Sequence, residues 1–422
     1  MPIHSLWSEY RSHHAPSRLA RWRPLLAALP ILFVAACTSQ SREPFTDADL
    51  VAHREADEAV AREDFADAVR RLTDRVYAKC EAHHESPLGP APTLDILAMS
   101  GGGDYGAFGA GVLVGWGQIA DPAARRPDFD GVTGVSTGAL LAPFAFLDTD
   151  EECLKVETFY RNPRTDWVQS RGLLFFLPNF PSFMEIPGLE RDLNTAFDTA
   201  MIERIAARAQ EGRLLAISAT NLDFGEQRVW ELGKLAERAT TDESRDRIRR
   251  MLRASAAIPA VFPPVMIDGD LFADGGVTAN VLLRLDPESP IGFIHLWRTR
   301  YPDRPLPTVR YWIIVNNQAN QLPKTVQPRW PAIVAPSLAT AIRSATFAEI
   351  RWLAAQANYV NAAYHTDIKV KVLSIPDDWR PPVPGDFKKE TMDSLADLGR
   401  KLGADPASWT DWVKQPPEAP GR

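Results

Sequence analysis

Gly134-Val135-Ser136-Thr137-Gly138 is the stretch that decides the fold of this chain. Residues 129–135 read as a strand that enters a sharp turn, and the small apolar residues 139–142 read as a helix that leaves it. A serine between two glycines in this setting is typical of a nucleophile elbow, because a larger neighbour would crowd the strained turn. Ser136 is therefore the predicted nucleophile.

A second glycine-rich stretch, Ser100-Gly101-Gly102-Gly103, lies upstream. It follows an apolar run of strand type, residues 94–99, and precedes a helical run of small residues, 105–116. Backbone N–H groups in a loop that opens a helix lack intrahelical partners and lie at the positive end of the helix dipole. The three glycines are therefore the predicted oxyanion-binding residues, and the second and third are the favoured donors.

The same glycines also fit a dinucleotide fingerprint, Gly101-x-Gly103-x-x-Gly106. A nicotinamide-dependent oxidoreductase is therefore an alternative. Asp121 and Asp128 are the acidic residues available to bind a ribose, but neither clearly ends a second strand. The serine turn would also have no role in such a protein, so acyl transfer is the preferred interpretation.

Four motifs in this order resemble the patatin-like phospholipase family. They are the two stretches above, the run Ala-Ser-Ala-Ala-Ile-Pro-Ala-Val-Phe-Pro-Pro at residues 254–264, and Asp274-Gly275-Gly276. The resemblance runs from about Leu94 to about Leu283. It implies an α/β protein with a three-layer α/β/α fold and a central, mostly parallel sheet.

The resemblance also implies a catalytic Ser–Asp dyad, with Ser136 as nucleophile and Asp274 as its partner. The implied enzyme is a carboxylic ester hydrolase that acts on phospholipid, lysophospholipid or another acyl ester. In a dyad the carboxylate must accept the serine proton itself, which is easier if burial raises its pKa. The competing interpretation of Asp274-Gly275-Gly276 is an ordinary hairpin turn.

The histidines agree with a dyad, because none lies in a recognisable catalytic context. His365 is the best alternative as a triad base. His295 lies in an apolar run, residues 292–297, that predicts a strand or the end of one.

Two departures from the family pattern concern the candidate site. Family members usually carry Arg or Lys where this chain has Tyr105, and the neighbouring Asp104 would disfavour negative charge on a nearby oxyanion. Asn280 keeps a family asparagine, but the proline that usually follows is missing. An active enzyme with altered preference is expected. The alternative is a catalytically weak lipoprotein that binds lipid or a partner.

The N-terminus predicts export and lipid anchoring. Arginines precede the apolar run of residues 24–36, which is too short to span a membrane stably. Val34-Ala35-Ala36-Cys37 resembles a bacterial lipobox, which implies cleavage before Cys37 and lipid attachment to its sulfur. Thr38 in the next position implies sorting to the outer membrane. The predicted location is the bacterial cell envelope, on the outer membrane facing the periplasm; a buried strand is the alternative for the apolar run.

Two cysteines remain after Cys37, namely Cys80 and Cys153. A disulfide between them and a pair of free thiols are both open from sequence. No cysteine or histidine spacing resembles a metal site, so neither a metal nor a cofactor is predicted.

The charge balance is acidic, with 47 Lys and Arg against 54 Asp and Glu. Removal of residues 1–36, which hold four Arg and one Glu, would change the formal charge from −7 to −10. A nucleic-acid partner is therefore not expected. Membrane contact is predicted through the Cys37 anchor or the apolar stretch 173–184, which is either a lid over Ser136 or a buried core loop.

The predicted organisation is one catalytic domain with flanking segments, and 45% hydrophobic residues suffice for a sizeable core. The segments are a signal peptide (1–36), a tether (37–45), a helical N-terminal segment with a linker (46–93), the catalytic core (94–285), and an extension that completes the domain and ends in a disordered tail (286–422). Further strands are predicted at 213–219, 311–315 and 368–373, and a helix at 339–358.

Overall fold

A computed structural model describes residues 45–87, 91–172, 181–321 and 323–413. The predicted signal peptide, Cys37 and almost all of the tether lie outside these residues. So do residues 173–180 of the apolar stretch and the predicted tail after residue 413.

A nine-stranded sheet forms the centre of the described fold. Its five middle strands are parallel and lie in the order β10 (Ile368–Ile375), β9 (Thr308–Gln318), β1 (Thr93–Met99), β2 (Gly131–Val135), β5 (Leu214–Asn221). The antiparallel strands lie toward the two edges and are β11 (Thr410–Asp411), β6 (Glu226–Glu231), β7 (Val265–Ile267) and β8 (Asp270–Asp274). A separate two-stranded sheet joins β3 (Gln169–Ser170) and β4 (Met184–Glu185).

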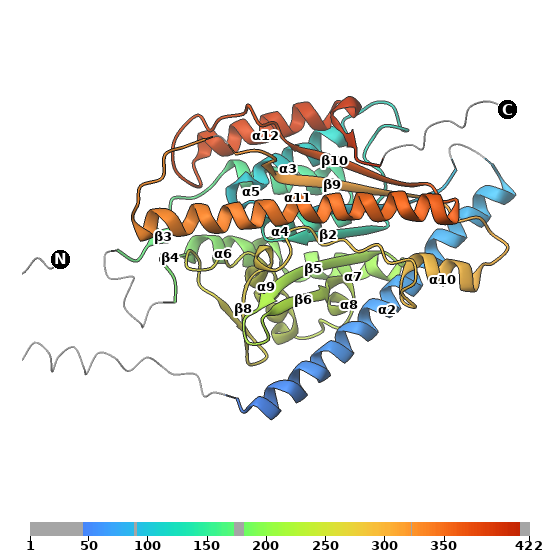
Figure 1. The fold of residues 1–422 in the computed structure, drawn as a ribbon, viewed down its shortest axis with the longest axis horizontal. Coiled ribbons are helices and arrows are strands. Elements are labelled where there is room, and N and C mark those ends of the chain that lie inside the picture. The colour runs from blue at the N-terminus through green and yellow to red at the C-terminus, as the bar shows by residue number, and fades with distance from the viewer. Residues whose placement is uncertain (1–44, 88–90, 173–180, 322, 414–422) are drawn as a thin grey trace, which may run out of the picture. The chain divides into compact units, whose positions relative to one another are not determined.

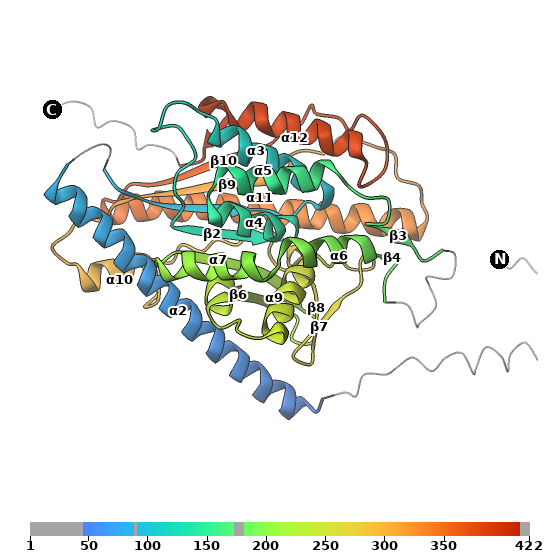
Figure 2. The ribbon, with the colours of Figure 1, turned by 180° about the vertical axis from the view of Figure 1, so that it is seen from behind.

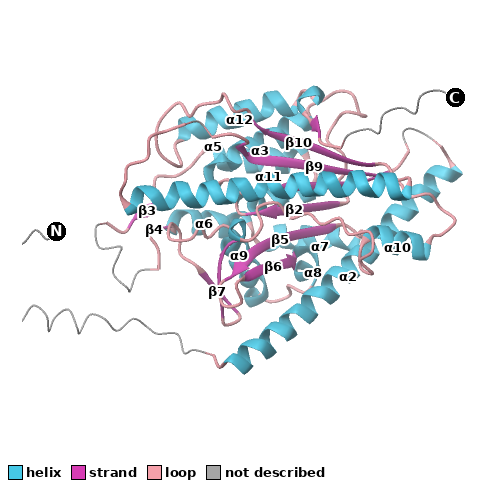
Figure 3. Cartoon of the chain, viewed as in Figure 1, coloured by secondary structure: helices cyan, strands magenta, loops and turns pink. Residues whose placement is uncertain are grey.

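Helices cover both faces of the sheet (Figures 1 and 3). One face carries α2 (Asp47–Glu85), α10 (Phe293–Arg300) and α11 (Trp330–Tyr364), whose buried side chains share one hydrophobic cluster. The opposite face, nearer the viewer in Figure 2, carries α3 (Gly106–Gly117), α4 (Thr137–Leu147), α5 (Asp150–Arg161), α6 (Pro187–Ala196), α7 (Thr199–Gln210), α8 (Leu232–Glu237), α9 (Asp242–Ser255) and α12 (Lys389–Gly403). The predicted three-layer α/β/α fold is therefore confirmed.

The central elements read as continuous apolar runs because both of their sides are covered. β2 and β5 are buried along their whole length, as expected for parallel strands between two helical layers. α4 is buried on every side, which explains why its sequence has no polar face. The predicted nucleophile, Ser136, thus lies between β2 and α4, two fully buried elements.

The helix predicted near the N-terminus is confirmed as α2. Thr46 caps it by accepting a hydrogen bond from the Asp49 N–H. Val69, Leu72 and Val76 are three and four residues apart, a spacing that predicts one apolar helical face, and all three are buried against the sheet.

The strand predicted at residues 292–297 is wrong, because these residues begin helix α10. Ile294 and Trp297 are buried one helical turn apart, and Arg298 and Arg300 lie in the last turn, where cations are favourable. A short apolar run of this kind does not distinguish a strand from a helix.

Cys80 and Cys153 are both free thiols. Cys80 lies on α2 and Cys153 on α5, so the two residues are on opposite faces of the sheet. Burial raises the pKa of Cys153 to about 12, as expected for an unreactive structural thiol.

Candidate active site

Strand β5 pairs with both β2 and β8 and so brings the ends of these two strands together. β2 pairs with residues 214–218 of β5, and β8 pairs with residues 219–221. Because β6 occupies the other edge of β5, β2 and β8 lie end to end on the same edge. Val135 pairs with Ser218, and Asp274 pairs with the next residue, Ala219. Ser136, which follows Val135, therefore lies next to Asp274.

Ser136 and Asp274 are in direct contact. Ser136 Oγ donates a hydrogen bond of 2.6 Å to Asp274 Oδ2, and the Gly276 N–H donates one of 2.8 Å to Asp274 Oδ1. Ser136 is 4% exposed and Asp274 is 3% exposed. Burial raises the pKa of Asp274 to about 6, against the opposing effect of these two hydrogen bonds. The carboxylate is therefore a stronger base than an ordinary aspartate.

The backbone at Ser136 is strained, with φ 54° and ψ −125°, a combination that non-glycine residues rarely adopt. Neighbouring glycines make the turn possible. A Cβ on Gly134 would overlap the carbonyl group of Gly138, and a Cβ on Gly138 would overlap the carbonyl oxygen of Met99 on β1. Both glycines of the elbow motif are thus required by close backbone contacts.

Ser255 supports the elbow from the end of α9. Its Oγ accepts a 2.9 Å hydrogen bond from the Ser136 N–H and donates one of 2.6 Å to the Ser218 carbonyl oxygen. Ser255 is fully buried. It belongs to the quoted run 254–264, but only the folded chain reveals its contact with the nucleophile.

The glycine-rich loop needs a correction at its first residue. The Gly101 N–H donates a 3.0 Å hydrogen bond to Asn280 Oδ1, and Asn280 Nδ2 donates one of 2.8 Å to Thr346 on α11. Gly101 therefore has no free N–H for an oxyanion. Within the described residues no such bond is present for the N–H groups of Gly102 and Gly103. The oxyanion-binding prediction is thus limited to Gly102 and Gly103.

Asn316 at the end of β9 holds the same loop in place, and sequence reasoning assigned it no role. Its side chain accepts a hydrogen bond from the Gly109 N–H at 3.0 Å and donates one to the Ser100 carbonyl oxygen at 2.8 Å. Its own N–H donates to Ser100 Oγ at 2.9 Å. No sequence motif marks this asparagine, because its partners are more than two hundred residues away.

Asp104 and Tyr105 follow the glycine-rich loop, and the resemblance described above implies an Arg or Lys at the position of Tyr105. Asp104 is buried and accepts a 2.9 Å hydrogen bond from the Phe387 N–H. Burial raises its pKa to about 6. Tyr105 packs against the ring of Trp379, with the ring centroids 5.5 Å apart. Backbone N–H groups are thus the donors that this loop offers to an oxyanion.

A small apolar cavity of about 30 Å³ lies over Ser136. It is lined by Gly103, Ser136, Thr137, Leu140, Phe159, Tyr160, Trp167, Leu189, Ala256, Ile258, Phe262 and Phe387. Apolar and aromatic side chains dominate this lining, which suits an acyl chain better than a polar substrate.

The alternative base, His365, is exposed at the C-terminal cap of α11, whereas the hydroxyl of Ser136 donates to Asp274. In the ranges that the structure describes, no group of three or more His, Cys, Asp or Glu side chains is arranged to hold a metal ion.

The pKa of Asp274 leads to a prediction about pH. If this carboxylate accepts the serine proton, it must be ionised, so kcat/KM for a soluble ester should rise with its ionisation near pH 6. A pH–rate profile between about pH 5 and about pH 8 measures this. Asp104 also ionises near pH 6 and would then oppose charge on the oxyanion. The Asp104→Asn variant should therefore keep the rise, because Asp104 is not the proton acceptor, and should show it at least as fully as the wild type. A flat profile would contradict the assignment of Asp274.

This chain is similar to a family model and to known proteins over parts of its length. Residues 97–285 match the family model described as patatin-like phospholipase. A relative described as an uncharacterized protein, R571, from Acanthamoeba polyphaga mimivirus is 25% identical over 189 residues, which are 45% of this chain and 60% of that protein. The chain thus spans less than two thirds of the length of this relative. VipD from Legionella pneumophila is similar over 76% of this chain and 68% of its own, with 10% identity and a TM-score of 0.34.

Proposed function

We propose that this protein is a lipid acyl hydrolase, a serine esterase with Ser136 and Asp274 as its catalytic dyad, because residues 97–285 match the family model described as patatin-like phospholipase. The contact between Ser136 Oγ and Asp274 Oδ2, 2.6 Å long and buried at a strained turn, carries the proposal. A serine and its base within hydrogen-bond reach are the signature of an activated nucleophile.

The proposed reaction has two halves. Ser136 Oγ attacks the ester carbonyl carbon while its proton passes to Asp274 Oδ2, and the N–H groups of Gly102 and Gly103 stabilise the oxyanion. The tetrahedral intermediate then collapses, and the leaving alcohol takes the proton from Asp274. In the second half, water attacks the acyl-enzyme carbonyl while one of its protons passes to Asp274; the bond from the acyl carbon to Ser136 Oγ then breaks, and Oγ takes the proton from Asp274. The products are a carboxylic acid and the regenerated serine.

The proposed substrate is a phospholipid or lysophospholipid. The apolar cavity over Ser136 supports an acyl chain as the part that enters. Expansion of this small cavity would be needed for a long chain, and the aromatic residues Phe159, Phe262 and Phe387 are the lining side chains that would have to move.

A second function is supported by Asp104. A buried carboxylate beside the glycine loop, without the usual cation, opposes negative charge on an oxyanion when it is ionised. This observation favours a catalytically weak protein that binds lipid or a partner on the same fold. The two functions differ in the reactivity of Ser136.

Covalent labelling of the purified protein by a fluorophosphonate probe tests the proposal. We expect the label on the peptide that contains Ser136, and no label in Ser136→Ala, because an activated serine attacks phosphorus as it attacks an ester carbonyl. Ser255→Ala is the comparison variant. It removes a second buried hydroxyl near the site but leaves the nucleophile, so the label should still be found on the peptide that contains Ser136. A folded protein that resists the probe in the presence of detergent would favour the binding function.

We also propose that the protein is anchored to the outer membrane of a bacterial envelope by lipid on Cys37, after removal of residues 1–36. The lipobox-like Val34-Ala35-Ala36-Cys37 supports this. In the part of the chain that the structure describes, no helix has the length and hydropathy to span a membrane.

Expression in a Gram-negative host tests the anchor. The Cys37→Ser variant should move from the membrane fraction to the soluble fraction and lose incorporation of labelled palmitate, because the acceptor sulfur is absent. Cys80→Ser should leave both unchanged. Continued membrane association and labelling of the Cys37 variant would refute the anchor.

A further inference from the structure

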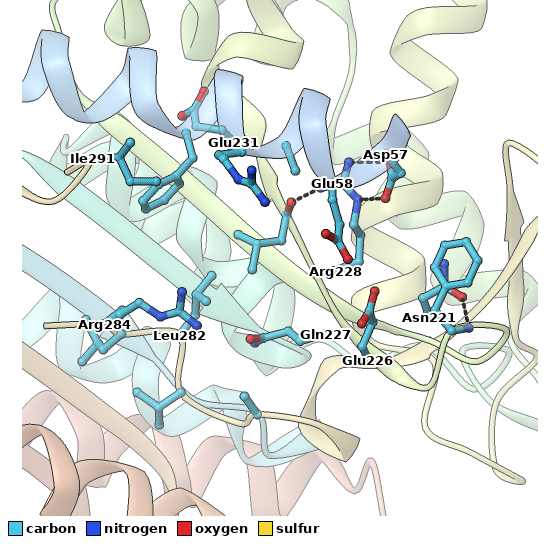
Figure 4. A pocket seen from close by; sticks show the side chains of 18 of the residues that line it. Asp57, Glu58, Asn221, Glu226, Gln227, Arg228, Glu231, Leu282, Arg284 and Ile291 are labelled. Carbon is cyan, nitrogen blue, oxygen red and sulfur yellow. Dashed lines mark hydrogen bonds and ion pairs between the residues drawn. The ribbon is translucent and has the colours of Figure 1, made fainter. Parts of the chain in front are cut away.

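A pocket separate from the catalytic cavity lies between α2, β6 and the segment that follows β8 (Figure 4). Its volume is about 440 Å³, within the range of about 300–1,000 Å³ that is usual for small-molecule sites. It shares no lining residue with the cavity over Ser136. The pocket therefore has the size of a small-molecule binding site and is distinct from the catalytic cavity.

Much of the pocket wall is apolar. The apolar lining residues are Ala61, Phe65, Phe224, Val229, Ala279, Val281, Leu282, Leu283 and Ile291. They come from α2, from β6 and the turn before it, and from the chain between β8 and α10. A ligand that fills this space must present apolar surface to them.

Every acidic side chain in the lining already has a partner. Asp57 is paired with Arg228 at 2.7 Å, a contact drawn as a dashed line in Figure 4. Glu58 and Glu226 are both paired with Arg54. Glu231 accepts the Leu215 N–H, and Glu349 accepts the Val281 N–H, each at 3.1 Å. Asp57 is thus balanced by one arginine, whereas Glu58 and Glu226 share a single arginine. Burial raises the pKa of Glu231 and of Glu349 to about 7, which reduces the negative charge of these two carboxyl groups at neutral pH.

The two remaining charged residues of the lining are cations. Arg62 comes from α2, and Arg284 comes from the segment after β8. Neither makes an ion pair or hydrogen bond within the described residues, and Figure 4 shows Arg284 beside Leu282 without a dashed contact. The pocket therefore combines an apolar wall with two guanidinium groups that are free to bind an anion.

A neighbouring pocket provides a comparison. It also has a volume of about 440 Å³, and the two pockets share Asp57, Ala61, Arg228, Val229 and Glu231. Its other charged residues are paired, as His53 with Asp270, Arg238 with Asp64, and Arg247 with Asp268. Unpaired positive charge is thus a property of the first pocket and not of every hollow beside α2.

We propose that the pocket lined by Arg62 and Arg284 binds an amphiphile with one apolar chain and one anionic group. The chain contacts the apolar wall, and the two guanidinium groups bind the anion, since planar guanidinium suits carboxylate and phosphate geometry. A fatty acid and a lysophosphatidate share this chemistry. The assignment does not depend on catalysis by Ser136.

The test uses the Ser136→Ala protein, so that no ligand is hydrolysed. Isothermal titration calorimetry with oleate, and separately with oleoyl lysophosphatidate, below their micellar concentrations should show saturable binding. Arg62→Gln with Arg284→Gln should weaken it at least tenfold, and oleyl alcohol should bind at least tenfold more weakly than the anions. The anion with the lower Kd shows whether the pocket prefers a free fatty acid or a lysophosphatidate.

The matched control is Lys324→Gln with Arg351→Gln, which also removes two exposed cations but lines neither pocket beside α2. It should bind as the parent does. Ile291→Trp, which enlarges a side chain that lines this pocket and not the neighbouring one, should abolish binding and gives a second test if the arginine variant does not fold. Binding that is absent, or that survives both the arginine and the tryptophan substitutions in folded protein, overturns the proposal.

Discussion

Asp274→Asn is expected to lower kcat/KM for an ester substrate by about a thousandfold, within the range usual for loss of general base catalysis. An asparagine has nearly the same shape and can still bond Ser136 Oγ and the Gly276 N–H, whose distances to Asp274 are 2.6 Å and 2.8 Å. It cannot accept the serine proton. Steady-state kinetics on a soluble ester, together with the rate of fluorophosphonate labelling, measure the loss.

Asp270→Asn is the matched control for this variant. Asp270 lies on the same strand, β8, and is also buried, but its contacts are with Asn221 and His53. Its replacement should leave kcat/KM within a few-fold of the wild type. If Asp274→Asn retained more than about a tenth of the activity, Asp274 would not be the base.

Loss of activity in Asp274→Asn should not come from unfolding. Burial raises the pKa of Asp274 from an ordinary 3.8 to about 6, so the folded protein favours the protonated form. The stability contributed by this group is therefore complete below about pH 4 and is lost as pH rises through about 6. Asparagine stays neutral, so the melting temperature of the variant at about pH 8 should equal or exceed that of the wild type.

Gly138→Ala is expected to destabilise the protein by more than about 4 kcal/mol, which places it among the severe single substitutions. The added Cβ would overlap the carbonyl oxygen of Met99, a backbone atom of the central strand β1 that cannot move without disturbing the sheet. Thermal unfolding followed by circular dichroism measures the effect, and little soluble protein is an equivalent result.

Gly131→Ala is the control for this steric argument. Gly131 begins β2, and its added Cβ would meet Ile96 Cδ1 at 2.7 Å, the far end of a flexible side chain. Its cost should be clearly smaller than that of Gly138→Ala. If Gly138→Ala melted close to the wild type, the tight contact between the elbow and β1 would be wrong.

Local sequence was sufficient for the features that depend on neighbouring residues. The glycines around Ser136 and the loop at residues 100–103 are recognisable because steric demands act over a few positions. The apolar spacing in α2 and the apolar run of β5 predicted their elements for the same reason. Residues 292–297 failed, because six apolar-rich residues fit a strand and a helix equally well.

By itself, the sequence determined the fold class, the position of the elbow and the candidate pair Ser136 and Asp274, the last through ordered motifs rather than through geometry. Only the tertiary structure decided that β2 and β8 end against each other on β5. It also decided that Asn280 takes the Gly101 N–H and that Ser255 takes the Ser136 N–H. The physical reason is that propensity and steric limits act along the chain, whereas a buried polar group takes whichever partner the packing of distant elements brings within hydrogen-bond reach.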